Sequence, residues 1–192
     1  MRNICVFIQS SGSCLKDSGI KEINKLVHVY TGDGKGKTTA ALGLALRVAG
    51  TGAKVYIGQF LKGRYCSELA SLKKIKNIKI EQFGRACFIK SRPEEKDIQL
   101  ANAGLKAAQK AVFSQRYALV ILDEMCVALN LKLISLQDIL NLITNVPKDI
   151  DVVLTGRCAH PDILKQADLV SEIKERKHYY QQGVKARRGI EF

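Results

Sequence analysis

The sequence has no tryptophan, and aromatic residues make up only 6% of its 192 residues. Proteins that bind single-stranded nucleic acid stack bases on aromatic side chains, so this scarcity weakens that interpretation. Long apolar runs are also lacking, and the N-terminal apolar stretch at residues 4–8 is too short for a secretory signal. We therefore expect a cytoplasmic protein without a membrane span.

The cysteines do not form a CxxC pair, so the ligand spacing of a zinc site is missing. They are scattered along the chain, and several stand beside apolar segments. In a reducing compartment such cysteines are expected to be free thiols that behave as small apolar side chains. The six are Cys5, Cys14, Cys66, Cys87, Cys126 and Cys158.

Acidic residues are few, with 18 Asp and Glu against 31 Lys and Arg, and the formal net charge is +13. This excess favours anionic partners, among them nucleotide triphosphates, nucleic acid or an acidic protein. Basic residues gather at 73–79 and 174–188, and both clusters are better interpreted as a solvated basic surface than as a binding site.

The chain divides into a serine-rich N-terminal extension, residues 1–25, and a domain over residues 26–192. In the domain, apolar strand-like runs alternate with helical stretches, which predicts an α/β fold. We expect a parallel sheet of about six strands with helices on both faces and a ligand at the carboxyl ends of the strands. The expected strands are 26–30, 54–60, 78–83, 118–122, 152–155 and 169–173, and the expected helices are 37–49, 97–113, 136–143 and 161–167.

Residues 29–39 (VYTGDGKGKTT) end the first strand and open an Ala/Leu-rich helix. This pattern is typical of a P-loop, whose glycines let backbone N–H groups turn toward phosphate oxygens at a helix N-terminus. Lys37 can then reach the terminal phosphates, and the Thr38 hydroxyl can ligate magnesium. We expect the nucleotide to be bound by Gly32, Asp33, Gly34, Lys35, Gly36, Lys37, Thr38 and Thr39.

The loop departs from the usual pattern in one position, because Thr31 stands where the first glycine is expected. A glycine-rich turn without a ligand is the alternative interpretation. A dinucleotide-binding fingerprint fits less well, since Lys37 replaces its third glycine.

Two further strand ends carry groups suited to a nucleotide. Asp123 and Glu124 follow the apolar run 118–122, where they can hold magnesium directly or through water, so the expected metal site is Thr38, Asp123 and Glu124. Arg157 follows the strand at 152–155 and can neutralise phosphate charge, although a surface arginine after a turn would look the same. We assign no catalytic role to His28 or His160.

No GxSxG elbow and no recognisable Cys/His nucleophile pair is present, and no general base is evident. Two classes of chemistry remain open. One is hydrolysis or transfer of phosphate, and the other uses the nucleotide as the electrophile, with its polyphosphate leaving.

Several segments together resemble one family, the P-loop type of ATP:corrinoid adenosyltransferase, also called cob(I)alamin adenosyltransferase. The resemblance runs from about residue 27 to 192, and its ordered set is more specific than the P-loop alone. The segments are 31–41 (TGDGKGKTTAA), 59–63 (QFLKG), 121–124 (ILDE), 154–157 (LTGR), 162–164 (DIL), 167–168 (AD), 170–172 (VSE), 177–178 (KH), 183–186 (GVKA) and 189–192 (GIEF).

The resemblance implies a P-loop NTPase fold of the RecA-like type and an enzyme in adenosylcobalamin biosynthesis or salvage. The enzyme would transfer the 5′-deoxyadenosyl group of ATP to the cobalt(I) of a corrinoid, cob(I)alamin or cob(I)yrinic acid a,c-diamide, and release triphosphate. ATP, Mg²⁺ and the corrinoid would bind, with catalytic roles for Lys37, Thr38, Glu124 and Arg157. Cobalt(I) is a strong nucleophile that carries no proton, which agrees with the missing general base.

The resemblance also places the segment 83–88 over the corrinoid, where Phe88 would help remove the lower cobalt ligand. Some members carry a Phe and a Trp there, whereas this chain has no Trp, so Phe88 would act alone or with Phe83. The first 25 residues do not match the helix that caps the site in some members. A reduced flavoprotein as electron donor and a homodimer are further implications.

Two other functions compete with this interpretation. The charge of +13 and the P-loop would suit a nucleic-acid-stimulated ATPase, whose binding would weaken steeply as salt rises. A non-catalytic nucleotide- or corrinoid-binding module would bind without chemistry. The ordered motifs favour the adenosyltransferase, for which no nucleic-acid partner is expected.

Overall fold

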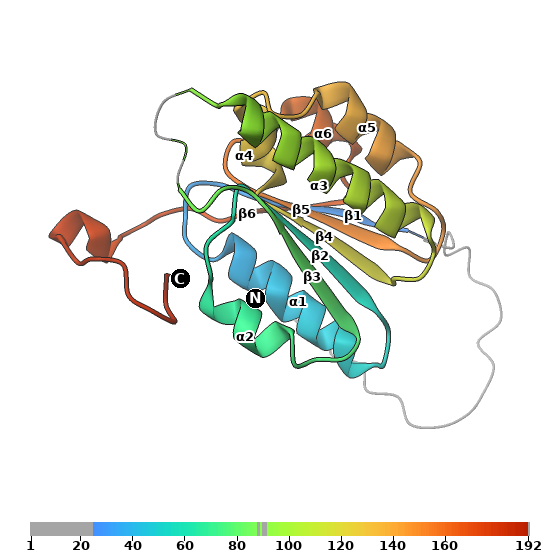
Figure 1. Cartoon of the computed structure of the whole chain (residues 1–192), viewed down its shortest axis with the longest axis horizontal. Helices are drawn as coiled ribbons and strands as arrows, with labels where there is room; N and C mark the ends of the chain where they lie inside the picture. Colours follow the sequence, from blue (N-terminus) through green and yellow to red (C-terminus); the bar gives the residue numbers. More distant parts are fainter. Residues whose placement is uncertain (1–24, 88, 90–91, 192) are drawn as a thin grey trace, which may run out of the picture.

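The computed structural model describes residues 25–87, 89 and 92–191, which form a six-stranded sheet covered by helices (Figure 1). The strands are β1 (Val27–Thr31), β2 (Val55–Phe60), β3 (Ile78–Phe83), β4 (Leu119–Asp123), β5 (Asp151–Thr155) and β6 (Leu169–Glu172). The helices are α1 (Lys37–Gly50), α2 (Ser67–Leu72), α3 (Glu95–Phe113), α4 (Met125–Asn130), α5 (Leu136–Thr144), α6 (Pro161–Gln166) and the 3₁₀ helix η1 (Tyr179–Gln182).

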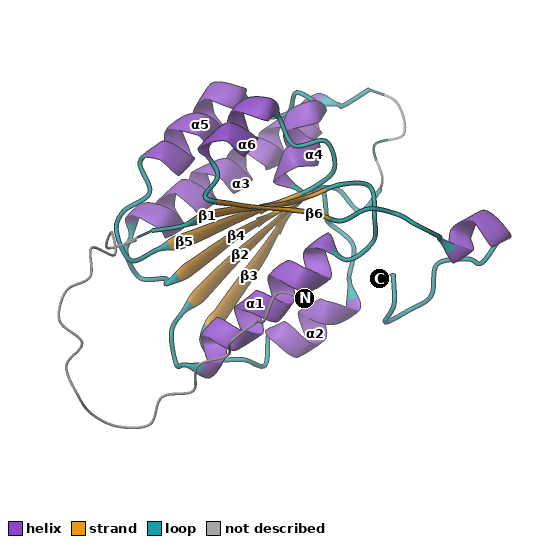
Figure 2. Ribbon diagram, turned by 180° about the vertical axis from the view of Figure 1, so that it is seen from behind, coloured by secondary structure: helices purple, strands orange, loops and turns teal. Residues whose placement is uncertain are grey.

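The strands are ordered β3-β2-β4-β5-β1-β6, and every neighbouring pair is parallel. Helices α1 and α2 cover one face of the sheet, and α3, α4, α5 and α6 cover the other (Figure 2). All residues of β2 and β4 are buried, as their continuous apolar runs predict. The predicted six-stranded parallel sheet with helices on both faces is therefore confirmed.

Helix α3 packs against the sheet with one apolar face, whose residues stand four, three and four positions apart. Ala101, Leu105, Ala108 and Val112 are each at most 5% exposed. Gly104 lies on the same face, where a Cβ atom would stand 2.7 Å from Cγ of Phe83 and so inside contact distance. The helix can approach the sheet this closely only because Gly104 has no side chain.

Edge strand β6 is attached to β1 by more than its ladder. The Asp168 carboxylate accepts a hydrogen bond from the Val27 amide at 2.8 Å, and the Asp168 amide donates to the Val27 carbonyl at 2.9 Å. On the other side of β1, the carboxylate of Asp151 in β5 accepts a hydrogen bond from the Leu26 amide at 3.0 Å.

Within the described part of the chain, no helix combines the length and apolar character needed to cross a membrane.

Candidate active site

The loop between β1 and α1 has the backbone that its glycines predict. Gly32 and Gly36 adopt φ angles of 100° and 124°, which side chains rarely tolerate. A Cβ on Gly32 would lie 2.4 Å from the Ile173 carbonyl oxygen, and the Gly34 amide donates to that oxygen at 2.7 Å. The segment after β6 therefore fixes the shape of the loop.

Thr31, the departure from the usual pattern, contributes to this support. Its side chain is buried, and its hydroxyl accepts a hydrogen bond from the Ala159 amide at 3.2 Å. A threonine here ties the end of β1 to the segment after β5, which a glycine could not do through a side chain.

The loop opens onto a cavity of about 810 Å³, which is within the range of small-molecule sites. Nine residues expected to bind nucleotide or metal line it: Asp33, Gly34, Lys35, Gly36, Lys37, Thr38, Thr39, Glu124 and Arg157. Gly32 lines a neighbouring cavity of about 630 Å³ instead, which Arg157 also borders. Phe88 lies outside the described residues.

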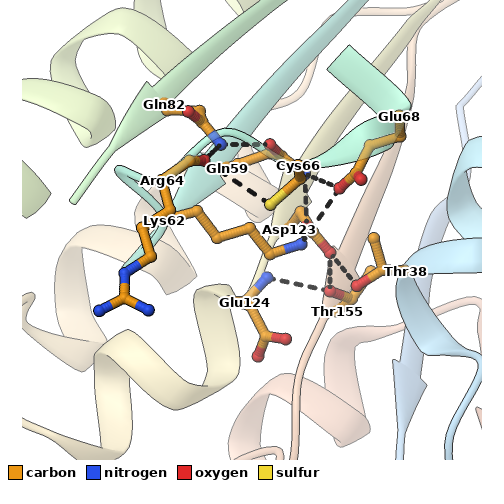
Figure 3. Close-up of polar contacts among 10 residues, drawn as sticks. All are labelled: Thr38, Gln59, Lys62, Arg64, Cys66, Glu68, Gln82, Asp123, Glu124 and Thr155. Carbon is orange, nitrogen blue, oxygen red and sulfur yellow. Dashed lines mark hydrogen bonds and ion pairs between the residues drawn. The ribbon is translucent and has the colours of Figure 1, made fainter. Parts of the chain in front are cut away.

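Asp123, which was expected to hold metal, is fully buried and does not line this cavity, whereas its hydrogen-bond partners Thr38 and Lys62 do. Its Oδ1 accepts hydrogen bonds from the hydroxyls of Thr38 and Thr155, both at 2.8 Å (Figure 3). Its Oδ2 accepts from Gln59 Nε2 at 3.2 Å and from Lys62 Nζ at 2.8 Å. Four donors thus surround a carboxylate that offers about four acceptor positions.

Glu124 turns the chain from β4 into α4 in a left-handed conformation, with φ at 62°. Its amide donates to the Thr155 hydroxyl at 2.9 Å, and its side chain lines the cavity. Burial, and next the charge of Asp123, raise the pKa of the Glu124 carboxyl above its usual value, against the opposing effect of Lys62. This carboxylate would be stabilised by an added cation.

Lys37 is also buried, and its Nζ donates to the Gly34 carbonyl of its own loop at 2.6 Å. Burial, and next the charge of Arg157, lower the pKa of the Lys37 ammonium. Arg157 follows Gly156, whose φ of 140° and close approach to Cys126 leave no room for a Cβ. Lys37 and Arg157 would therefore both attract a polyphosphate in the cavity, while they repel each other.

Comparison with known proteins agrees with this geometry. The family model for ATP:corrinoid adenosyltransferase BtuR/CobO/CobP matches residues 24–192. The chain belongs to the ATP:corrinoid adenosyltransferase family. It is 32% identical to a corrinoid adenosyltransferase of Escherichia coli K12 over 167 residues, which cover 87% of this chain and 85% of the relative. It is 34% identical to one of Pseudomonas aeruginosa over 166 residues, 85% and 82% of the two chains.

A solved structure shows the fold of this adenosyltransferase in another protein. The KaiC-like protein PH0186 of Pyrococcus horikoshii OT3 superposes with a TM-score of 0.53 at 20% identity, over 80% of this chain and 73% of that one. At this identity the likeness concerns the fold alone, and it agrees with the predicted parallel sheet with helices on both faces.

The C-terminal segment of the adenosyltransferase forms part of the cavity wall, which sequence reasoning missed. His178, Gly189, Ile190 and Glu191 line the cavity, and Lys35 Nζ donates to the Ile190 carbonyl at 2.8 Å and pairs with Glu191 at 2.9 Å. A hydrogen bond from the Tyr179 hydroxyl, with Lys35 and Arg187 nearby, lowers the pKa of Glu191 to about 2. The motifs at 177–178 and 189–192 were part of the family resemblance, but the resemblance did not indicate what these residues do.

Lys62, Gln59 and Glu68 form a second group that sequence reasoning left without a role. Gln59 Nε2 bridges Asp123 and Glu68, the latter at 3.3 Å, and Lys62 Nζ lies 3.8 Å from Glu68 (Figure 3). Burial alone would lower the pKa of Lys62, but Asp123 and Glu68 raise it above its ordinary value. The QFLKG motif was the signal in the sequence for two of these residues.

Proposed function

We propose that this adenosyltransferase binds ATP with its triphosphate in the P-loop cavity and transfers the adenosyl group to a corrinoid. One observation carries the proposal: the loop amides, Lys37, Glu124 and Arg157 line a single cavity. Family membership supplies the reaction, and this arrangement supports the phosphate-binding half of it.

In the reaction, cobalt(I) attacks the 5′ carbon of ATP with its electron pair. A cobalt–carbon bond forms, the bond from C5′ to the oxygen of the α-phosphate breaks, and that electron pair leaves with triphosphate. The protein needs no base for this step. Its contribution is to orient the ATP and to stabilise the leaving charge through the loop amides, Lys37 and Arg157.

We also propose that Mg²⁺ accompanies the nucleotide. No cluster of three or more His, Cys, Asp or Glu that could hold a metal exists among residues 25–87, 89 and 92–191. The Thr38 hydroxyl and the Glu124 carboxylate nevertheless give hard oxygen groups beside the loop, and Mg²⁺ commonly completes such a site with phosphate oxygens and water. Bound Mg²⁺ would neutralise charge on the leaving triphosphate.

The remaining parts of the reaction are proposed from resemblance. Phe88 would contact the corrinoid, and a reduced flavoprotein would supply electrons to a cytoplasmic homodimer. The net charge of +13 supports an acidic donor, because opposite charges speed encounter.

An anaerobic assay tests the function. The protein, ATP, Mg²⁺ and chemically reduced cobalamin should yield a photolabile adenosyl product and triphosphate. Lys37→Ala should lower kcat by about 10²–10³-fold, because it removes a preorganised cation from the leaving group. Lys74→Ala, an exposed lysine outside the cavity, is the matched control and should retain activity. No adenosyl product from the unsubstituted protein would contradict the proposal.

A further inference from the structure

Asp123 has no acceptor position to spare. Its two oxygens receive the hydroxyls of Thr38 and Thr155, the amide of Gln59 and the ammonium of Lys62, at 2.8 to 3.2 Å. A metal ion, or a water bound to one, that approaches this carboxylate must therefore share or replace one of these donors.

The four donors differ in how easily they can leave. Thr155 and Gln59 are fully buried in β5 and β2, and Thr38 lies in the first turn of α1. The Lys62 side chain is 22% exposed, lines the cavity and ends in a long flexible stem. Lys62 is thus the donor that can move from Asp123 toward a ligand in the cavity.

The backbone around Lys62 is held firmly even though its side chain is not. Leu61 adopts a left-handed φ of 60°, and its amide donates to the Phe83 carbonyl at 3.0 Å. Gly63 lies so close to Gly84 that a Cβ would be 2.1 Å from the Gly84 carbonyl oxygen. The base of the Lys62 side chain therefore has a fixed position at the cavity edge.

The other two lysines of the cavity, like Lys62, form hydrogen bonds or ion pairs within the protein. Lys35 is paired with Glu191, and Lys37 donates to the Gly34 carbonyl. A triphosphate that leaves with an extra negative charge needs further cations nearby, since charge stabilisation in such a site is the main contribution to catalysis.

We propose that Lys62 is a triphosphate-binding residue that is held on Asp123 until the nucleotide and its metal arrive. The incoming cation takes over the neutralisation of Asp123, and the Lys62 ammonium turns to the phosphate oxygens. This inference rests on the proposed location of the triphosphate in the P-loop cavity. Lys62 then joins Lys37 and Arg157 in holding the leaving group.

Calorimetric titration with tripolyphosphate and Mg²⁺ tests the inference without turnover. Lys62→Gln keeps an amide donor for Asp123 but removes the charge, so it should fold and weaken tripolyphosphate binding by about tenfold or more. Lys62→Arg keeps the charge and should remain within about threefold of the unsubstituted protein. Lys74→Gln, an exposed lysine outside the cavity, controls for loss of net charge and should leave the affinity unchanged.

Manganese binding without nucleotide, followed by electron paramagnetic resonance, gives a second readout. The Lys62→Gln variant lacks the ammonium group beside Asp123 that repels a metal ion. It should therefore bind Mn²⁺ about fivefold more tightly, or better, than the unsubstituted protein. A purely structural lysine would leave both affinities unchanged, and equal tripolyphosphate affinities for Lys62→Gln and the unsubstituted protein would overturn this inference alone. Failure of the unsubstituted protein to bind tripolyphosphate would overturn the proposed function as well.

Discussion

Glu124 carries two unfavourable features at once, a left-handed backbone and a carboxylate whose pKa is raised by burial and by Asp123. A residue that only stabilised the fold would avoid both. Strain and misplaced charge of this kind concentrate where a protein binds something, because the ligand relieves them. In the free adenosyltransferase, ionised Glu124 therefore opposes folding.

Glu124→Gln should consequently raise the melting temperature at neutral pH and lower adenosyl transfer by about 10–100-fold through weaker metal binding. Because the folded-state pKa lies above the ordinary value of 4.5, the stability gain should vanish below about pH 4.5. It should grow as the pH rises through the folded-state pKa and then level off. Thermal unfolding across this pH range measures it, and a destabilised variant at neutral pH would contradict the argument.

The individual site residues could be predicted only where their pattern is local. The loop 32–39 and the acidic end of β4 are contiguous, and the structure places nine of the predicted residues around one cavity. Glu68 has no such pattern, and the contiguous motif 59–63 marked Lys62 without giving it a role. Gln59 meets Asp123 only because the β2–β4 register pairs them, and pairing between distant segments cannot be worked out from spacing along the chain.

At the scale of elements, the sequence revealed the helices that were long or had a clear signal at one end. Helix α3, of 19 residues, repeats its apolar face several times, and the helix predicted at 97–113 differs from it only by two residues at the start. Helices α2 and α4 have six residues each, fewer than two turns, and were not predicted. A segment this short has too few turns to show a periodicity. Helix α6 also has six residues, but Pro161 in its first turn marks where it begins, and it was predicted.

Gly104 in α3 gives a prediction at this scale. An alanine gains about 1 kcal/mol of helix propensity, but its Cβ would lie 2.7–2.8 Å from the rings of Phe83 and Phe60. Overpacking costs about 1–3 kcal/mol, so Gly104→Ala should destabilise by up to about 2 kcal/mol in urea unfolding. Gly43→Ala in α1 is the control. A Cβ added there would meet no atom outside its own helix backbone within 4 Å, so this substitution should stabilise the protein. Equal effects at the two glycines would contradict this packing argument.

At the scale of the molecule, the sequence predicted the parallel sheet but not the order of its strands. Alternation of strands and helices requires crossovers, yet it leaves several orders possible. The observed order depends on contacts such as the Asp168 carboxylate on the Val27 amide, which joins residues 141 positions apart. The predicted strand at 169–173 gave no indication that it would form an edge beside β1.

Asp168→Ala should loosen that edge. Loss of its hydrogen bond at a partly exposed site costs about 1 kcal/mol. The amides of β6 should then exchange with deuterium faster, whereas those of β4 in the sheet interior serve as an internal control and should not change. Unchanged exchange in β6 would show that its ladder alone holds the strand.

The position of β1 between β5 and β6 also has a consequence for the nascent chain. The phosphate loop emerges from the ribosome early. Strands β5 and β6, which flank β1, and Ile173, whose carbonyl shapes the loop, are synthesised much later. Non-local pairing of this kind must wait for the downstream segment. A growing chain should therefore not bind ATP while it is being synthesised. Nucleotide binding should appear abruptly once β6 has paired with β1.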